Sequence, residues 1–223
     1  DRDEFPHKFP NIEIISLPGK AIVPGFIDAH VHLGQGFIKS LQCGEPSQVW
    51  RRINMPLERV IDAELSYVSA KLMMLEALRG GFTTVNNFAI INKEKADALH
   101  QAAVDTGIRL VSATGAMDLD ADGVTAEKIP VKSIDDALER AEEHFTSCEN
   151  FEMVYPSLCV TNVDTGSKEM IGALVGYCLR ENALFQIHAN EHLPEVHGSV
   201  VKYGRRPLEF ISDCGGLGRN SVV

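Results

Sequence analysis

The chain has 223 residues, of which 44% are hydrophobic and 23% charged, as in globular proteins rather than disordered or fibrous ones. Its formal net charge of -10 argues against a nucleic-acid surface, which needs a basic patch, and no apolar run reaches the roughly 20 residues that cross a bilayer. The five cysteines are widely spaced and show no C-x-x-C pattern. The cysteines predict reduced thiols in a cytoplasmic protein. The charge and the lack of a long apolar run predict a protein without a membrane or nucleic-acid partner.

The first predicted strand covers residues 22–32, in the apolar run "IVPGFIDAHVH". A loop rich in glycine and proline follows, and residues 63–81 are predicted to form a helix that Gly80 and Gly81 close. Its apolar residues at helical spacing are expected in the core: Leu65, Val68, Leu72, Leu75 and Leu78.

Four further units of strand and helix follow. The strands are predicted at 82–88, 108–116, 151–160 and 183–190, and the helices at 92–107, 133–145, 167–182 and, as helical turns, 194–213. Asn92 and Ser133 are expected as N-caps and Gly107 as a helix stop. The chain ends on what resembles the opening of a sixth strand.

Five successive units of this kind imply parallel strands joined by helical crossovers, which is the α/β class. The chain lacks G-x-G-x-x-G after the first strand and lacks G-x-x-x-x-G-K-[ST], the phosphate-binding signatures of open doubly wound sheets. Its potential ligands follow strand ends instead, as they do in barrels. We therefore expect a (β/α)8 TIM-type barrel, of which this chain supplies only about the first five units.

Two histidines, His30 and His32, end the first strand and face the same side, because strand side chains alternate with period two. Alone they could be a packed pair or could share a metal ion. His188 ends the fifth strand at the same rim, and Glu191 follows it. Three neutral imidazoles suit Zn²⁺ or another divalent cation, and a carboxylic acid that is not a ligand could move protons beside the bound water.

Three segments in register, "PGFIDAHVHL", "GFTTVNNF" and "FQIHANEH", resemble the amidohydrolase superfamily, specifically its deaminase and chlorohydrolase branch. The resemblance implies that His30, His32 and His188 bind one divalent ion, Zn²⁺ before Fe²⁺, and that Glu191 is the acid-base residue. It also implies a small-molecule substrate, an amino-substituted heteroaromatic ring that loses ammonia by hydrolysis.

The same resemblance divides the chain into residues 1–20, the tail of a flanking small β-sandwich, and residues 21–223, a partial barrel. A His ending strand six and an Asp ending strand eight would then lie beyond Val223. The chain is accordingly interpreted as a fragment, inactive or nearly so in isolation, of a protein expected to be a homo-oligomer.

Three further residues bear on the identity of the substrate. Glu58 resembles the ribose-binding Glu of the methylthioadenosine/S-adenosylhomocysteine deaminases, but an acid in a first helical turn can also simply stabilise the dipole. Trp50 could belong to a substrate lid or anchor a loop. Ser157 stands where that group usually has a substrate-binding His, which leaves the substrate open.

Three alternatives remain. The first is a chlorohydrolase or another C-N hydrolase of the superfamily. The second is the hydantoinase branch, which is disfavoured because residues 151–160 contain no lysine to bridge two metals. The third is a metal-binding subunit without catalysis. His100 and His144, on predicted helices, are interpreted as structural.

Overall fold

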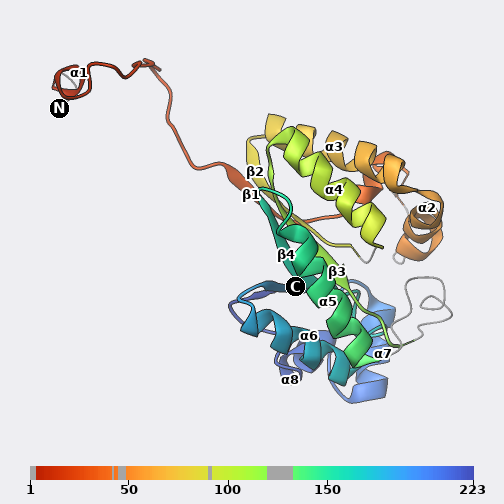
Figure 1. Ribbon diagram of the computed structural model, residues 1–223. Helices are drawn as coiled ribbons and strands as arrows, with labels where there is room; N and C mark the ends of the chain where they lie inside the picture. Colours follow the sequence, from red (N-terminus) through yellow and green to blue (C-terminus); the bar gives the residue numbers. More distant parts are fainter. Residues whose placement is uncertain (1–3, 42, 45–48, 90–91, 120–132) are drawn as a thin grey trace.

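The computed structural model describes residues 4–41, 43–44, 49–89, 92–119 and 133–223, and these form a sheet flanked by helices (Figure 1). Within them the sheet has six parallel strands in the order β1-β2-β3-β4-β5-β6. The strands are β1 (Phe26–Val31), β2 (Phe82–Asn87), β3 (Arg109–Gly115), β4 (Val154–Val160), β5 (Leu184–Ile187) and β6 (Ser221–Val222). The helices are α1 (Phe5–Lys8), η1 (Leu33–Ile38), η2 (Trp50–Asn54), α2 (Met55–Val60), α3 (Ala63–Arg79), α4 (Lys93–Thr106), α5 (Ile134–Cys148), α6 (Lys168–Arg180), α7 (Leu193–Tyr203) and α8 (Pro207–Asp213).

Strands that follow one another in the chain are neighbours in the sheet, and a helix connects each pair, which is the arrangement of a TIM-type barrel. The expected partial barrel is confirmed. The expected opening of a sixth strand is also present, because β6 pairs with β5 through Phe185 and Gln186. The described sheet therefore ends at β1 and β6.

The predicted helix boundaries are set by local hydrogen bonds. Asn92 accepts a hydrogen bond from the Lys95 backbone N–H, and Ser133 accepts one from Asp136 N–H, so both residues cap helices as expected. Gly107 ends α4 with φ of 73°, a left-handed conformation that glycine adopts without strain. These confirmed signals require only a few neighbouring residues.

Two clusters of buried apolar side chains hold the helices on the sheet. One joins α5, α6 and α8 to β4 and β5, and includes Leu174, Phe185 and Ile211. The other joins α3 and α4 to β2 and β3, and includes Met74 and Leu110. The first cluster includes Phe185 and Ile187 of β5, the strand that His188 follows.

Helix α3 buries a different face from the one that its leucines predict. Four of the five apolar residues expected in the core are more than 40% exposed: Leu65, Val68, Leu72 and Leu75. Their expected burial is wrong because η1 packs on the small-residue face instead. Ser69 Oγ donates a hydrogen bond to Leu33 O and accepts one from Gly36 N–H, at 2.7 and 2.9 Å. A Cβ at Gly36 would come within 2.9 Å of that same hydroxyl, so only glycine allows this approach.

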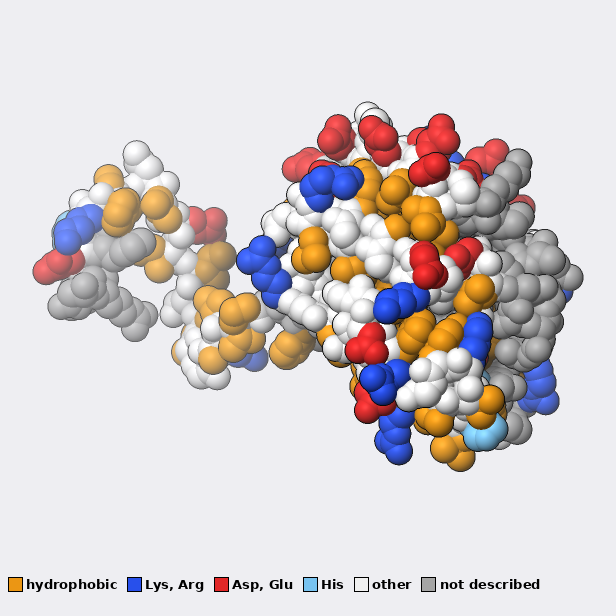
Figure 2. All heavy atoms as spheres, turned by 90° about the horizontal axis from the view of Figure 1, so that it is seen from below, with side chains coloured by type: hydrophobic (Ala, Val, Ile, Leu, Met, Phe, Trp, Pro, Cys, Tyr) orange, Lys and Arg blue, Asp and Glu red, His pale blue; other side chains and the backbone are white. Residues whose placement is uncertain are grey.

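The N-terminal segment stands clear of the barrel, and hydrophobic side chains cover much of it (Figures 1 and 2). Residues 9–25 contain neither helix nor strand, and Ile15, Ile22 and Val23 are exposed. The interpretation of residues 1–20 as the tail of a sandwich stays a prediction. Among the described helices, none combines the length and the apolar character that crossing a membrane requires.

Candidate metal centre

Three histidines from β1 and β5, which lie four places apart in the sheet, meet at one point. His30 lies in β1 and His32 follows it, while His188 comes directly after β5. His30 Nε2 lies 3.2 Å from His32 Nε2 and 3.2 Å from His188 Nε2. The curvature of the sheet thus brings together side chains that are 158 positions apart.

The spacing of these nitrogens fits a shared metal ion. Donor atoms about 2.0 Å from a tetrahedral zinc ion lie about 3.3 Å from one another. His188 Nδ1 is 2.8 Å from Thr161 O, and a carbonyl oxygen can only accept, so Nδ1 carries the proton and Nε2 keeps its lone pair toward the cluster. The ring is therefore held in the tautomer that a metal ligand needs.

The electrostatics of the cluster favour the neutral form of His30. Burial, followed by the neighbouring His188, lowers the pKa of His30, although Asp28 and Glu191 act in the opposite direction. A protonated ring would have no lone pair to donate. His30 is exposed and the other two rings are half-buried, so the cluster is open to small molecules.

The end of β2 supports the histidine strand through two side-chain amides that the sequence analysis did not single out. Asn86 Nδ2 donates to Ala29 O at 2.8 Å, and Asn87 Oδ1 accepts from Leu33 N–H at 2.9 Å. Phe88 packs against the His188 ring with centroids 4.2 Å apart. The only signal was the polar pair "NN" at the end of an apolar strand.

Glu191 follows His188 by three residues, between two bends of the chain. Its charge raises the pKa of His30, so the carboxylate lies within electrostatic reach of the cluster. The preceding Asn190 has φ of 57°, a left-handed conformation that asparagine tolerates better than most residues. The Glu191 backbone N–H donates to Glu195 Oε2 at 2.9 Å. Glu195 thus positions the turn, a role that the sequence analysis missed.

Glu195 is 1% exposed, and burial raises its pKa to about 7. An unfolded chain ionises this group near 4.5, so deprotonation favours unfolding as the pH rises between these values. We predict that the wild type loses about 3 kcal/mol of unfolding free energy, relative to Glu195→Gln, between pH 4.5 and 7. Urea denaturation of both proteins across this range measures the difference. Glu64→Gln, at an exposed site on α3, controls for the lost charge, and a constant gap between wild type and Glu195→Gln would contradict the prediction.

The two expected substrate residues are placed differently. Glu58 lines a small cavity together with His32 and Phe88, and its Oε1 accepts a hydrogen bond from Gln35 Nε2 at 2.8 Å. Trp50, half-buried at the start of η2, is not among the residues that line this cavity. The structure brings Glu58, but not Trp50, to the histidine cluster, and the role of either residue stays a prediction.

Comparison with known proteins identifies the family. The model of the amidohydrolase family matches residues 21–219, which include β1 to β5 and all three histidines of the cluster. The chain belongs to the amidohydrolase family. A curated relative of this amidohydrolase chain is the 5-methylthioadenosine/S-adenosylhomocysteine deaminase of Thermodesulfovibrio yellowstonii, 27% identical over 213 residues. The match covers 95% of this chain and 46% of that protein, so the chain spans about half the length of the relative.

Two solved structures show the same amidohydrolase fold. Guanine deaminase from C. acetobutylicum, with guanine bound in its active site, aligns with a TM-score of 0.81 and 20% identity, over 97% of this chain and 52% of the other. Atrazine chlorohydrolase from Arthrobacter aurescens, complexed with zinc, aligns with a TM-score of 0.71 and 21% identity, over 89% of this chain and 47% of the other. At these identities the likeness concerns the fold.

Proposed function

We propose that this chain carries the histidine half of the active site of a metal-dependent aminohydrolase. Its substrate class is an amino-substituted heteroaromatic ring, such as a purine nucleoside or base. The convergence of three Nε2 atoms beside Glu191 carries the proposal. It concerns the whole protein, because the chain spans about half the length of the deaminase that it matches.

In this proposal, the residues of the cluster and Glu191 have separate roles. His30, His32 and His188 hold the cation, and all-nitrogen donors suit Zn²⁺ first and Fe²⁺ second. A divalent cation at this place supplies a hydroxide nucleophile near neutral pH by lowering the pKa of water. Glu191 donates a proton to the ring nitrogen next to the amino-bearing carbon, which makes that carbon easier to attack.

In this proposal, Glu58 binds the part of the substrate that lies away from the metal ion. It shares a cavity with His32, and its hydrogen bond to Gln35 holds the carboxylate in place. A carboxylate accepts hydrogen bonds from paired sugar hydroxyls, which favours a nucleoside over a free base. Ser157 is buried and bonded to Gln186 Nε2 at 2.9 Å, so this hydroxyl is already engaged.

Replacing His188 by Asn is expected to remove one equivalent of bound zinc. The affinity should fall by on the order of 100-fold or more, because altering even the hydrogen-bond partners of metal ligands costs 10–100-fold. Titration of the purified chain against a chromophoric chelator measures this. His197→Asn, at an exposed histidine of α7, is the matched control, and equal zinc binding by both variants would contradict the metal site.

A chlorohydrolase is the second candidate, favoured by the likeness of this chain to the atrazine enzyme. Both reactions use a water-derived nucleophile and an acid, and they differ in the leaving group. A screen of the complete protein with Zn²⁺ or Fe²⁺ should detect ammonia release from adenosine derivatives or guanine. Chloride release from a chlorotriazine without any ammonia release would replace the first candidate with the second.

The proposal also includes the cellular compartment and the oligomeric state. None of the five cysteines forms a disulfide bond within the described residues, which supports a reducing compartment and hence the cytoplasm. The exposed apolar residues of α3, Leu65, Val68, Leu72 and Leu75, support the expectation of a homo-oligomer, because a surface of this kind is normally covered.

A further inference from the structure

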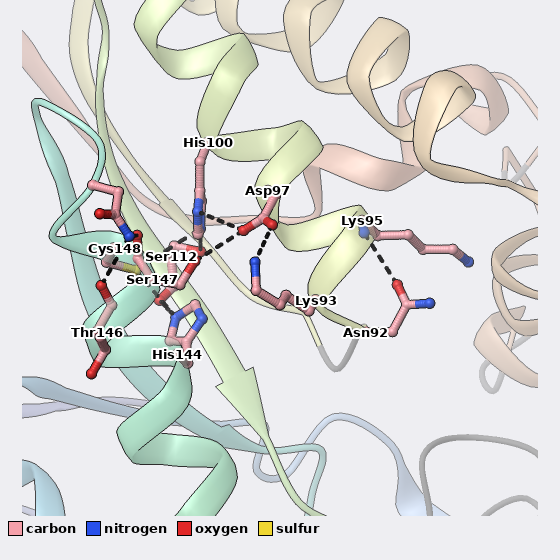
Figure 3. Close-up of polar contacts among 11 residues, drawn as sticks. Asn92, Lys93, Lys95, Asp97, His100, Ser112, His144, Thr146, Ser147 and Cys148 are labelled. Carbon is pink, nitrogen blue, oxygen red and sulfur yellow. Dashed lines mark hydrogen bonds and ion pairs between the residues drawn. The ribbon is translucent and has the colours of Figure 1, made fainter.

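A second group of potential ligands lies between β3 and the helices that cover it. His100 reaches down from α4, while His144 and Cys148 stand one turn apart on α5 (Figure 3). All three side chains are buried, and one donor atom from each lies within 4.8 Å of the others. The elements that carry these residues differ from those of the histidine cluster at β1 and β5.

The distances around the sulfur suit a tetrahedral ion. Cys148 Sγ lies 3.9 Å from His100 Nε2 and 3.7 Å from His144 Nε2. For Zn–N of about 2.0 Å and Zn–S of about 2.3 Å, a tetrahedral site separates nitrogen from sulfur by about 3.5 Å. Shifts of a few tenths of an ångström would therefore bring both nitrogens to the expected distance from the sulfur.

The imidazoles are neutral and one of them has an unused nitrogen. Burial, followed by His144, lowers the pKa of His100 to about 4, and burial also lowers the pKa of His144. His100 Nδ1 is completely buried and has no hydrogen-bond partner within the described residues. Asp97 Oδ1 lies 4.0 Å away, so the carboxylate stands where the second nitrogen of a metal-bound histidine normally finds one.

Ser112 of β3 contacts both nitrogens that would bind the ion. Its Oγ lies 2.8 Å from His100 Nε2, and its carbonyl oxygen accepts a hydrogen bond from His144 Nε2 at 2.9 Å. Binding would move the His144 proton to Nδ1. It would also release the thiol proton of Cys148, whose pKa burial raises to about 12. Each bound ion therefore liberates one proton to solvent and forms one metal–sulfur bond.

An access route exists on the side of α5. A cavity of about 300 Å³ is lined by residues of both helices, among them Asp97, His144 and Ser147. Ser147 Oγ donates to Asp97 Oδ1 at 2.9 Å, which orients the carboxylate toward His100 (Figure 3). A hydrated cation can thus reach His144 without unfolding the core.

We propose that His100, His144 and Cys148 form a second metal site, specific for a thiophilic divalent cation such as Zn²⁺ and separate from the three-histidine cluster. The mixed nitrogen and sulfur donors distinguish it from the first site, which has only nitrogen. Bound there, an ion would join α4 to α5 and stabilise this part of the barrel without taking part in hydrolysis.

Cobalt substitution tests the proposal because only a thiolate ligand gives Co²⁺ an intense charge-transfer absorption in the near ultraviolet. Titration of the chain with Co²⁺ should produce this band together with release of about one proton per chain, from the Cys148 thiol. The band should disappear in Cys148→Ala and in the less disruptive Cys148→Ser. It should persist in His188→Asn, which lacks a ligand of the other site.

Cys178→Ala is the matched control, since Cys178 is an equally buried helical cysteine whose pKa burial also raises to about 12. This variant should keep the band. Absence of the band in the wild type would show a hydrogen-bonded core cluster only, and would overturn the proposal. A band that survives both Cys148 substitutions, or that Cys178→Ala removes, would overturn it equally.

Discussion

Glu191→Gln is expected to lower kcat of the complete enzyme about 10²–10⁴-fold, the range in which a positioned proton donor contributes. Glutamine retains the size and the hydrogen-bonding capacity of the side chain but cannot transfer a proton to the ring. Ammonia release under saturating substrate, with zinc content measured on the same sample, separates this loss from a loss of metal. KM should change much less than kcat, because the proton moves in the transition state.

The control for this prediction is Glu209→Gln, which removes a carboxylate from the start of α8. Glu209 accepts a hydrogen bond from Arg206 N–H and has no part in the proposed chemistry. Its kcat should stay near that of the wild type. A Glu191→Gln enzyme that keeps kcat within tenfold of the wild type would remove Glu191 from the acid-base role.

The parts of the fold that the sequence predicted best depend on local physics. The caps at Asn92 and Ser133 and the stop at Gly107 each involve contacts within four residues, so a short window contains the whole signal. The alternation of strands and helices also follows from local periodicity. The order of the strands then follows because crossover connections in parallel sheets are short and right-handed.

The candidate metal centre was predictable only in part. Strand periodicity places His30 and His32 on one face, but nothing in their spacing brings His188 to them. The expected barrel indicated that third residue, because it places the end of the fifth strand at the same rim, and the family resemblance then implied its role as a ligand. The buried Glu195 was missed because a glutamate in the first turn of a helix normally interacts with solvent and the helix dipole. Its contact with the Glu191 backbone depends on the left-handed turn at Asn190, which single-sequence reasoning does not reveal.

The second histidine group shows the same limit. His100 and His144 each looked like an ordinary helical residue, because helix periodicity does not say which side chains of two separate helices face one another. Cys148 attracted no attention without a C-x-x-C pattern. Packing of α4 and α5 on β3 brings the three together around Ser112.

The second prediction compares a buried leucine of α6 with an exposed leucine of α3. Leu174→Ala, in the cluster under α6, is expected to lower the free energy of unfolding by ~2–5 kcal/mol, since it removes a buried side chain and leaves a cavity. Leu72→Ala makes the same chemical change on the exposed face of α3. At a protein concentration low enough to keep the chain monomeric, a surface substitution there should cost within ~0.5 kcal/mol. Urea denaturation midpoints, at equal slopes, measure both values.

The comparison of the two variants tests whether the leucine face of α3 is exposed in solution. Periodicity shows that α3 has an apolar face, but burial is decided by the segment that packs on it, and η1 packs on Ser69 and its neighbours instead. Equal losses for Leu72→Ala and Leu174→Ala would mean that the leucine face is covered in solution. A dependence of the Leu72→Ala loss on protein concentration would then identify the cover as a second copy of the chain, because only association is sensitive to concentration.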